Sequence, residues 1–141
     1  MLEDRAESAE PSLRMLRALA IVQANLDDAG LGEYVMQLVD DRTNMEGHPI
    51  FWAGLPDGRF SASSNCYIFE NADRTFAELV ALIAAAVQDT LIEVERVMWP
   101  TCVTHPGRWV EVRLSSNSVV WWCEVGSGHI SHPLGHLPAV L

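Results

Sequence analysis

The chain has 141 residues, a length that suits one domain able to bury a substantial core without disulfide staples. Nearly half of its residues are apolar and a fifth are charged, which excludes a disordered or fibrous protein. Its formal net charge of -10 would repel phosphate backbones, and its few basic residues are scattered. We therefore expect no nucleic-acid partner.

The N-terminal residues, the longest apolar run and the cysteines together indicate a cellular compartment. Residues 1–10 are acidic and lack the basic start and apolar run of a signal peptide, so we predict a disordered tail before one domain at 11–141. The longest apolar run, Leu79 to Val87, falls far short of the roughly 20 residues that span a membrane. Three cysteines without an export signal favour free thiols or a metal site. We expect a cytoplasmic protein that makes no membrane contact.

The first half of the chain predicts one helix and then a less regular stretch. Apolar residues recur at helical spacing from Met15 to Leu26, after a helix entry at Pro11-Ser12 and before Gly30. Residues 31–41 suit either a helix or a strand, and we favour a helix. Residues 43–73 read as short strands and loops around 49–52 and 66–69.

The second half predicts the longest helix and a hairpin. Thr75 and Glu78 resemble a capping box before an apolar stripe, and Pro100 should end that helix at Trp99. Residues 108–114 and 118–125 are β-rich runs around a Ser-rich turn. The expected fold is α+β, with two or three helices packed on a small antiparallel sheet that includes a C-terminal β-hairpin.

Cys102, His105 and Cys123 have the spacing of part of a zinc ribbon. Such ribbons hold zinc with two ligand pairs on tight turns about 15–20 residues apart, joined by a hairpin. Here seventeen residues separate His105 from Cys123, but Gly126 occupies the fourth position. The fourth ligand could be water or one of three later histidines, His129, His132 and His136. The set we predict is Cys102, His105, Cys123 and His129, with zinc as the possible cofactor.

Two alternatives to a structural zinc site stay open. The cysteines could be small buried apolar residues and the histidines ordinary loop residues. The Cys102/His105/Cys123 cluster could instead serve a small metal- or thiol-dependent hydrolase, with Glu124 as general base if its strand bulges. A cysteine hydrolase could use Cys66 with His48 or His105, oriented by Asp57 or Asn65, although no local motif supports it.

The same C-terminal region carries a resemblance. The run from Trp99 through Cys102 and His105 to Trp122-Cys123 and Gly126, followed by residues 134–137, resembles small uncharacterised proteins of high-GC bacteria. Those proteins end in a similar WP-x-C-x-x-H and W-x-C frame, like a degenerate zinc ribbon. The resemblance covers about the last third of the chain and implies no activity.

Strand alternation gives a candidate partner surface. It places Trp109, Arg113 and Trp122 on one face of the hairpin, while Val112 lies opposite Trp121 on the other face. Tryptophan and arginine are enriched at interface hot spots, although a helix of the same chain could also cover such a face. The expected function is that of an accessory module that binds another protein or a second copy of itself, and we favour this role over that of an enzyme.

Overall fold

The computed structural model describes residues 10–40, 50–61, 67–69, 73–116 and 118–134. Its elements, in chain order, are α1 (Leu13–Asp28), β1 (Gln37–Asp40), β2 (Phe51–Gly54), α2 (Phe76–Glu95), β3 (Glu111–Ser115), β4 (Ser118–Cys123) and β5 (His129–Pro133). The strands form two antiparallel sheets, β1-β2 and β3-β4-β5. The predicted α+β class is confirmed. The acidic tail lies outside the described residues except for Glu10.

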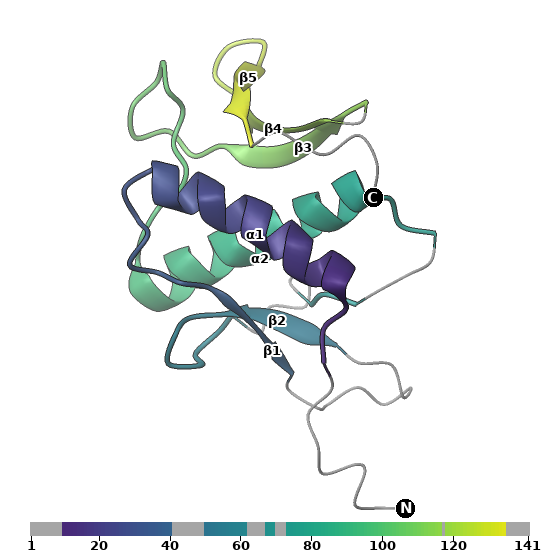
Figure 1. Ribbon diagram of the computed structural model, residues 1–141. Helices are drawn as coiled ribbons and strands as arrows, with labels where there is room; N and C mark the ends of the chain where they lie inside the picture. The colour runs from purple at the N-terminus through teal and green to yellow at the C-terminus, as the bar shows by residue number, and fades with distance from the viewer. Residues whose placement is uncertain (1–9, 41–49, 62–66, 70–72, 117, 135–141) are drawn as a thin grey trace, which may run out of the picture.

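The arrangement of layers differs from the prediction, in which the helices pack on a single sheet. Figure 1 shows α1 and α2 side by side between the two sheets, with β3-β4-β5 on one side and β1-β2 on the other. The central helix α2 contacts β2 as well as β3 and β4. A helix covered on both sides must be apolar over most of its circumference, which explains why ten of its residues are buried.

Helix α1 forms as its sequence predicts. The Ser12 hydroxyl accepts a hydrogen bond from the Met15 amide at 3.1 Å and so caps the first turn. The buried residues recur at helical spacing on the side that faces the core: Met15, Ala18, Leu19, Val22 and Leu26. Gly30, at φ +82°, turns the chain away just after the helix.

The prediction of a helix over 31–41 is wrong. Residues 37–40 form β1, which pairs with β2 in a register that sets Leu38 opposite Ala53. Gln23 on α1 guides the chain before the strand, because its amide donates to the Tyr34 carbonyl at 3.0 Å and accepts from the Met36 amide at 2.9 Å. Tertiary pairing therefore overrides a local pattern that suited both structures.

The region around β2 agrees with the expected strands and loops. Phe51 and Ile68 exchange two backbone hydrogen bonds of 2.8 Å, so residues 67–69 add a single bridge beside β2 rather than a full strand. All four residues of β2 are buried. A Cβ atom on Gly54 would lie 2.4 Å from Val39 Cγ2, so the Val39 side chain occupies the space that a side chain at position 54 would need.

Helix α2 begins as predicted and ends earlier. Both halves of the capping box are present between Thr75 and Glu78. The helix ends at Glu95, because Arg96 adopts a left-handed conformation at φ 59° and Val97 donates its backbone N–H to Leu91. The predicted end at Trp99 is wrong by four residues. The chain is already out of the helix before Pro100 is reached.

The C-terminal sheet has the predicted hairpin. Val112 lies opposite Trp121 and Glu111 opposite Trp122, as the strand alternation requires. Trp121 is fully buried and packs edge-on against Trp99, with ring centroids 5.2 Å apart. Neither described helix combines the length and the apolar character that a membrane crossing requires.

Candidate metal centre

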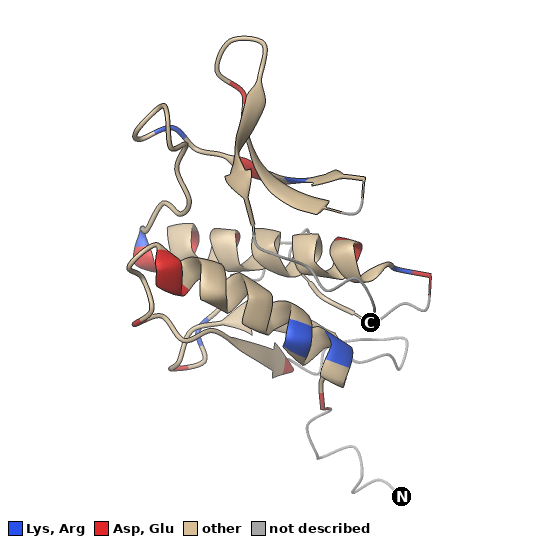
Figure 2. Ribbon diagram, turned by 45° about the horizontal axis from the view of Figure 1, so that its top comes forward, with Lys and Arg blue, Asp and Glu red and all other residues tan. Residues whose placement is uncertain are grey.

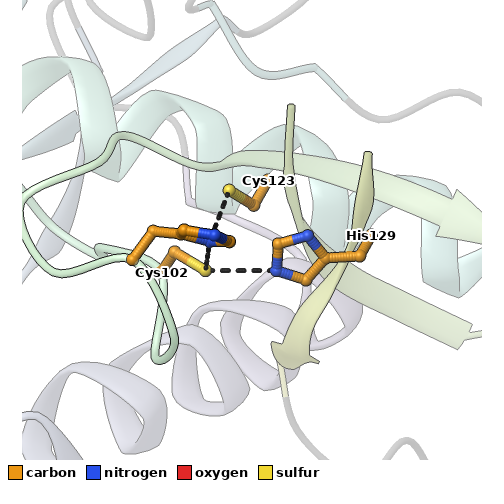
Figure 3. A group of neighbouring side chains, drawn as sticks. Cys102, Cys123 and His129 are labelled. Atoms are coloured by element: carbon orange, nitrogen blue, oxygen red, sulfur yellow. Dashed lines mark hydrogen bonds between the residues drawn. The ribbon is translucent and has the colours of Figure 1, made fainter. Parts of the chain in front are cut away.

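Four side chains from three segments meet at one end of the C-terminal sheet. Cys102 and His105 come from the loop between α2 and β3, Cys123 ends β4, and His129 begins β5. Figure 3 shows the Cys102, Cys123 and His129 side chains pointing toward one another. The ligand atoms of all four residues lie within 4.8 Å of one another. The cluster could therefore hold a metal ion.

The distances in the cluster have the scale of a coordination sphere. A tetrahedral zinc ion bound at about 2.3 Å to sulfur and about 2.0–2.1 Å to nitrogen brings its ligand atoms to about 3.3–3.8 Å from one another. Cys102 Sγ lies 3.3 Å from His129 Nε2 and 3.4 Å from His105 Nδ1, and Cys123 Sγ lies 3.7 Å from His105 Nδ1. These three separations match the edges of such a tetrahedron.

The first ligand pair sits on a tight loop, as a zinc ribbon requires. The Cys102 amide donates to the Arg108 carbonyl and the Arg108 amide donates to the His105 carbonyl, both at 3.0 Å. Thr101 forms a bridge with Trp109 that closes the loop at its base. Gly107, at φ +82°, provides the reversal. The loop thereby presents Cys102 and His105 on the side of Cys123.

Strand pairing selects His129 among the candidate histidines. His129 lies directly opposite Cys123 in the pairing of β4 with β5, so the two side chains share a face. Beyond a register shift in that pairing, His132 lies opposite Trp121 and is not one of the four clustered residues. Gly126, which holds the fourth position of the ribbon frame, is at φ +68° in the connecting turn. His136 lies outside the described residues.

The Cys102 sulfur is in an environment that favours thiolate. Burial raises the pKa of this thiol, but hydrogen bonds from Thr104, His105 and Ser131 oppose burial and lower it from 9.0 to about 4. The Thr104 hydroxyl lies 3.3 Å from the sulfur and 3.2 Å from His129 Nε2. Zinc binds cysteine as thiolate, so this electrostatic setting suits a metal ligand.

Thr104 and Ser131 are the functional residues that the sequence analysis missed. Ser131 Oγ accepts a hydrogen bond from the Val103 amide at 3.0 Å, which ties β5 to the loop that carries Cys102. Ser131 Oγ also lies 2.8 Å from His132 Nδ1, and burial lowers the pKa of this histidine. The sequence did contain a signal for these two residues, because each carries a hydroxyl group within two positions of a predicted ligand. Metal ligands are usually oriented by such hydrogen-bonding partners.

Of the residues considered for hydrolysis, Cys102, His105 and Cys123 come together, but Glu124 does not join them. Glu124 lies 3.4 Å from the Arg113 guanidinium on the exposed side of the hairpin, where it cannot act as a base at the cluster. Asp57 pairs with Arg59 at 2.7 Å in the turn after β2. Cys66, His48 and Asn65 lie outside the described residues.

The predicted partner surface is partly exposed. The Arg113 guanidinium stacks over the Trp122 ring, 4.7 Å from its centroid, and pairs with Glu111 at 2.6 Å. Trp109 is 38 % exposed, and Ile130, which lies opposite Trp122 on β5, is 49 % exposed. A mixed aromatic and charged surface therefore covers this side of the C-terminal sheet.

Comparisons with protein-family models, with curated proteins and with solved structures found no match. The resemblance of the C-terminal third to small bacterial proteins stays a prediction, and we infer function from the side chains of the cluster.

Proposed function

We propose that the chain is a small cytoplasmic protein-binding module whose C-terminal half is stabilised by one zinc ion. The observation that carries the zinc site is the convergence of Cys102, His105, Cys123 and His129, with all ligand atoms within 4.8 Å. Two cysteine and two histidine ligands favour zinc over harder metal ions, which prefer oxygen ligands.

A structural role accords best with four protein ligands. Structural zinc sites are closed by four residues, whereas catalytic ones keep a position for water. The loop from residue 96 to 110 has no helix or strand of its own and would gain a fixed link to β4 and β5. The hydrolase alternative is less well supported, because it needs an open coordination position and a base beside it.

Metal analysis of purified, untagged protein tests the zinc site. We expect about one zinc ion per chain by elemental mass spectrometry, with large losses in the Cys102→Ser, Cys123→Ser and His129→Gln variants. His132→Gln separates ligands from neighbours, because this histidine lies opposite Trp121 and contacts the cluster through Ser131, so the variant should keep most of its zinc. A folded wild-type protein without metal, or full zinc retention in the Cys102→Ser variant, would contradict the site.

The partner surface supports the second half of the proposal. Trp109, Arg113 and Trp122 combine exposed aromatic area with a charge, the composition that is enriched at interface hot spots. We expect the double variant Trp109→Ala/Arg113→Ala to lose a binding partner, or self-association, that the wild-type protein shows at equal zinc content. Identical co-purifying proteins and identical sedimentation for both forms would argue against this surface.

A further inference from the structure

A cleft lies between the end of α1, the segment after α2 and strand β5. Its volume is about 360 Å³, within the range of about 300–1,000 Å³ typical of ligand sites. The apolar part of its wall comes from the segment after α2 and includes Met98, Trp99 and Val103. Met98 and Val103 are 44 % and 65 % exposed, so a ligand in the cleft would remove apolar surface from water.

The polar part of the wall is negatively charged. Among the described residues that line the cleft, Asp28 is the acidic one and none is Arg or Lys. His132 also lines the cleft, and its burial favours the neutral imidazole. A bound cation would therefore meet an acidic side chain without a competing positive charge from the wall.

The direction of α1 adds to this negative potential. A helix dipole places partial negative charge at the C-terminal end, where basic residues are favourable and acidic ones are not. The last turn of α1 nevertheless carries Asp27 and Asp28 and has no basic residue. Figure 2 shows this distribution, with the basic residues of α1 near its beginning and the acidic ones at its end. The arrangement is unfavourable in isolation, and a cation at the cleft would relieve it.

Asn25 in the wall of the cleft is held in place by a hydrogen bond to the core. Asn25 lines the cleft, and its Oδ1 accepts a hydrogen bond of 3.0 Å from the indole N–H of the buried Trp121. Because indole can only donate, this bond fixes which end of the Asn25 amide faces Trp121. Preorganised walls of this kind reduce the entropy lost when a ligand binds.

We propose that this cleft binds a small molecule that joins an apolar body to a protonated amine, with the amine beside Asp28 and the body against the exposed side chains of Met98 and Val103. The site is separate from the Trp109/Arg113/Trp122 surface and from the four zinc ligands. It does not depend on the proposed function, although Thr101 and Val103 of its wall flank Cys102 in the sequence.

Calorimetric titration at pH 7.5 with three matched probes tests the proposal. Phenethylamine carries the aromatic body and the amine, 2-phenylethanol lacks the charge, and 3-phenylpropanoate reverses it. We expect the affinity to be highest for the amine, lower for the alcohol and lowest for the acid. Equal binding of the three probes, or no binding of the amine at millimolar concentration, would overturn the proposal. Zinc content is measured on the same samples, so that loss of metal is not mistaken for failure of the cleft.

Two aspartate variants locate the amine. Asp28→Asn should reduce phenethylamine affinity by about three- to fivefold, the size expected for a partly exposed ion pair, and leave the alcohol unchanged. Asp27→Asn is the control, because the Asp27 carboxylate accepts a hydrogen bond from Gln23 at 2.9 Å and does not line the cleft. Neither change should impair folding, since both remove an acid from a helix C-terminus. Equal losses in the two variants would contradict a site at Asp28.

A final comparison identifies the source of the amine. A tripeptide that begins with phenylalanine and has a free N-terminus presents the same chemistry at the end of a chain. Tighter binding of the peptide than of phenethylamine would assign the cleft to peptide N-termini, and weaker binding would assign it to free amines.

Discussion

Cys123 and His129 are direct partners in the antiparallel pairing of β4 with β5, and this pairing places a thiol and an imidazole on the same face of the sheet. The connecting turn depends on Gly128, which has φ +90°. A Cβ atom at this position would lie 2.5 Å from Trp122 Cζ2, so the turn also fixes how closely β5 approaches the Trp122 ring. The position of a candidate metal ligand is thus linked to a residue outside the cluster.

Replacement of this glycine should weaken metal binding. Gly128→Ala forces an L side chain into left-handed backbone and against Trp122, at a cost of at least about 1–2 kcal/mol. We expect zinc affinity to fall about tenfold, measured by competition with a chromogenic chelator. Gly58→Ala in the β2 turn is the control, because it has a similar φ of +91° but lies in the other sheet. Equal affinity in wild-type and Gly128→Ala proteins would contradict the link.

The depressed pKa of Cys102 predicts a pH dependence in metal-free protein. A thiol whose pKa is lower in the folded state than in the unfolded state adds stability above the unfolded value, near pH 9, and this stability is lost as pH falls toward about 4. After a chelator has removed any metal, the Tm of the protein should therefore decrease as the pH is lowered from 8 to 5. The Cys102→Ser variant should show a weaker slope over the same interval, and an unchanged slope would count against the thiolate.

Two buried polar residues of α2, Gln88 and Thr90, hydrogen-bond to opposite sides of the protein. Gln88 donates to the Val110 carbonyl at 2.6 Å, whereas Thr90 donates to the Ala53 carbonyl at 2.7 Å and accepts from the Ser61 amide at 3.0 Å. All three bonds are buried. Gln88→Leu and Thr90→Val should each lower the free energy of unfolding by about 1–3 kcal/mol, because each leaves a buried backbone group unpaired.

The two variants should differ in their effect on zinc. Gln88 holds the chain at the base of the metal-binding loop, and Thr90 holds the opposite sheet. We expect Gln88→Leu to lower zinc affinity and Thr90→Val to leave it unchanged, both assayed below their unfolding transitions. The reverse order would show that the two sheets are not independently attached to α2.

Arg96 marks a position where a glycine should stabilise the fold. Its φ of 59° is unfavourable for a residue with a Cβ atom, whereas glycine adopts it readily at the end of a helix. Arg96→Gly should raise the free energy of unfolding in urea denaturation, because relief of about 1–2 kcal/mol of left-handed strain exceeds the about 0.4–1 kcal/mol lost to a more flexible unfolded chain. Arg96→Ala keeps the Cβ atom and should give no such gain, so a gain in both variants would attribute the effect to the lost charge.

The sequence determined the parts of this protein that depend on neighbouring residues. The apolar spacing of α1, the capping box at Thr75 and the hairpin between β3 and β4 all follow from local geometry, and these predictions are confirmed. The spacing of Cys102 and His105 likewise corresponds to a tight loop, although their role as metal ligands stays a prediction. The same local signals left residues 31–41 open between helix and strand, because apolar residues there fit both periods.

The tertiary structure decided what depends on distant partners. Pairing with β2 made residues 37–40 a strand, and two separate sheets surrounded the helices where one sheet was expected. The choice of His129 over His132 depended on the register of β5 against β4, which includes an irregularity between Trp121 and Trp122. A one-residue change of register reverses the face on which a side chain lies, and spacing along the chain does not contain that information.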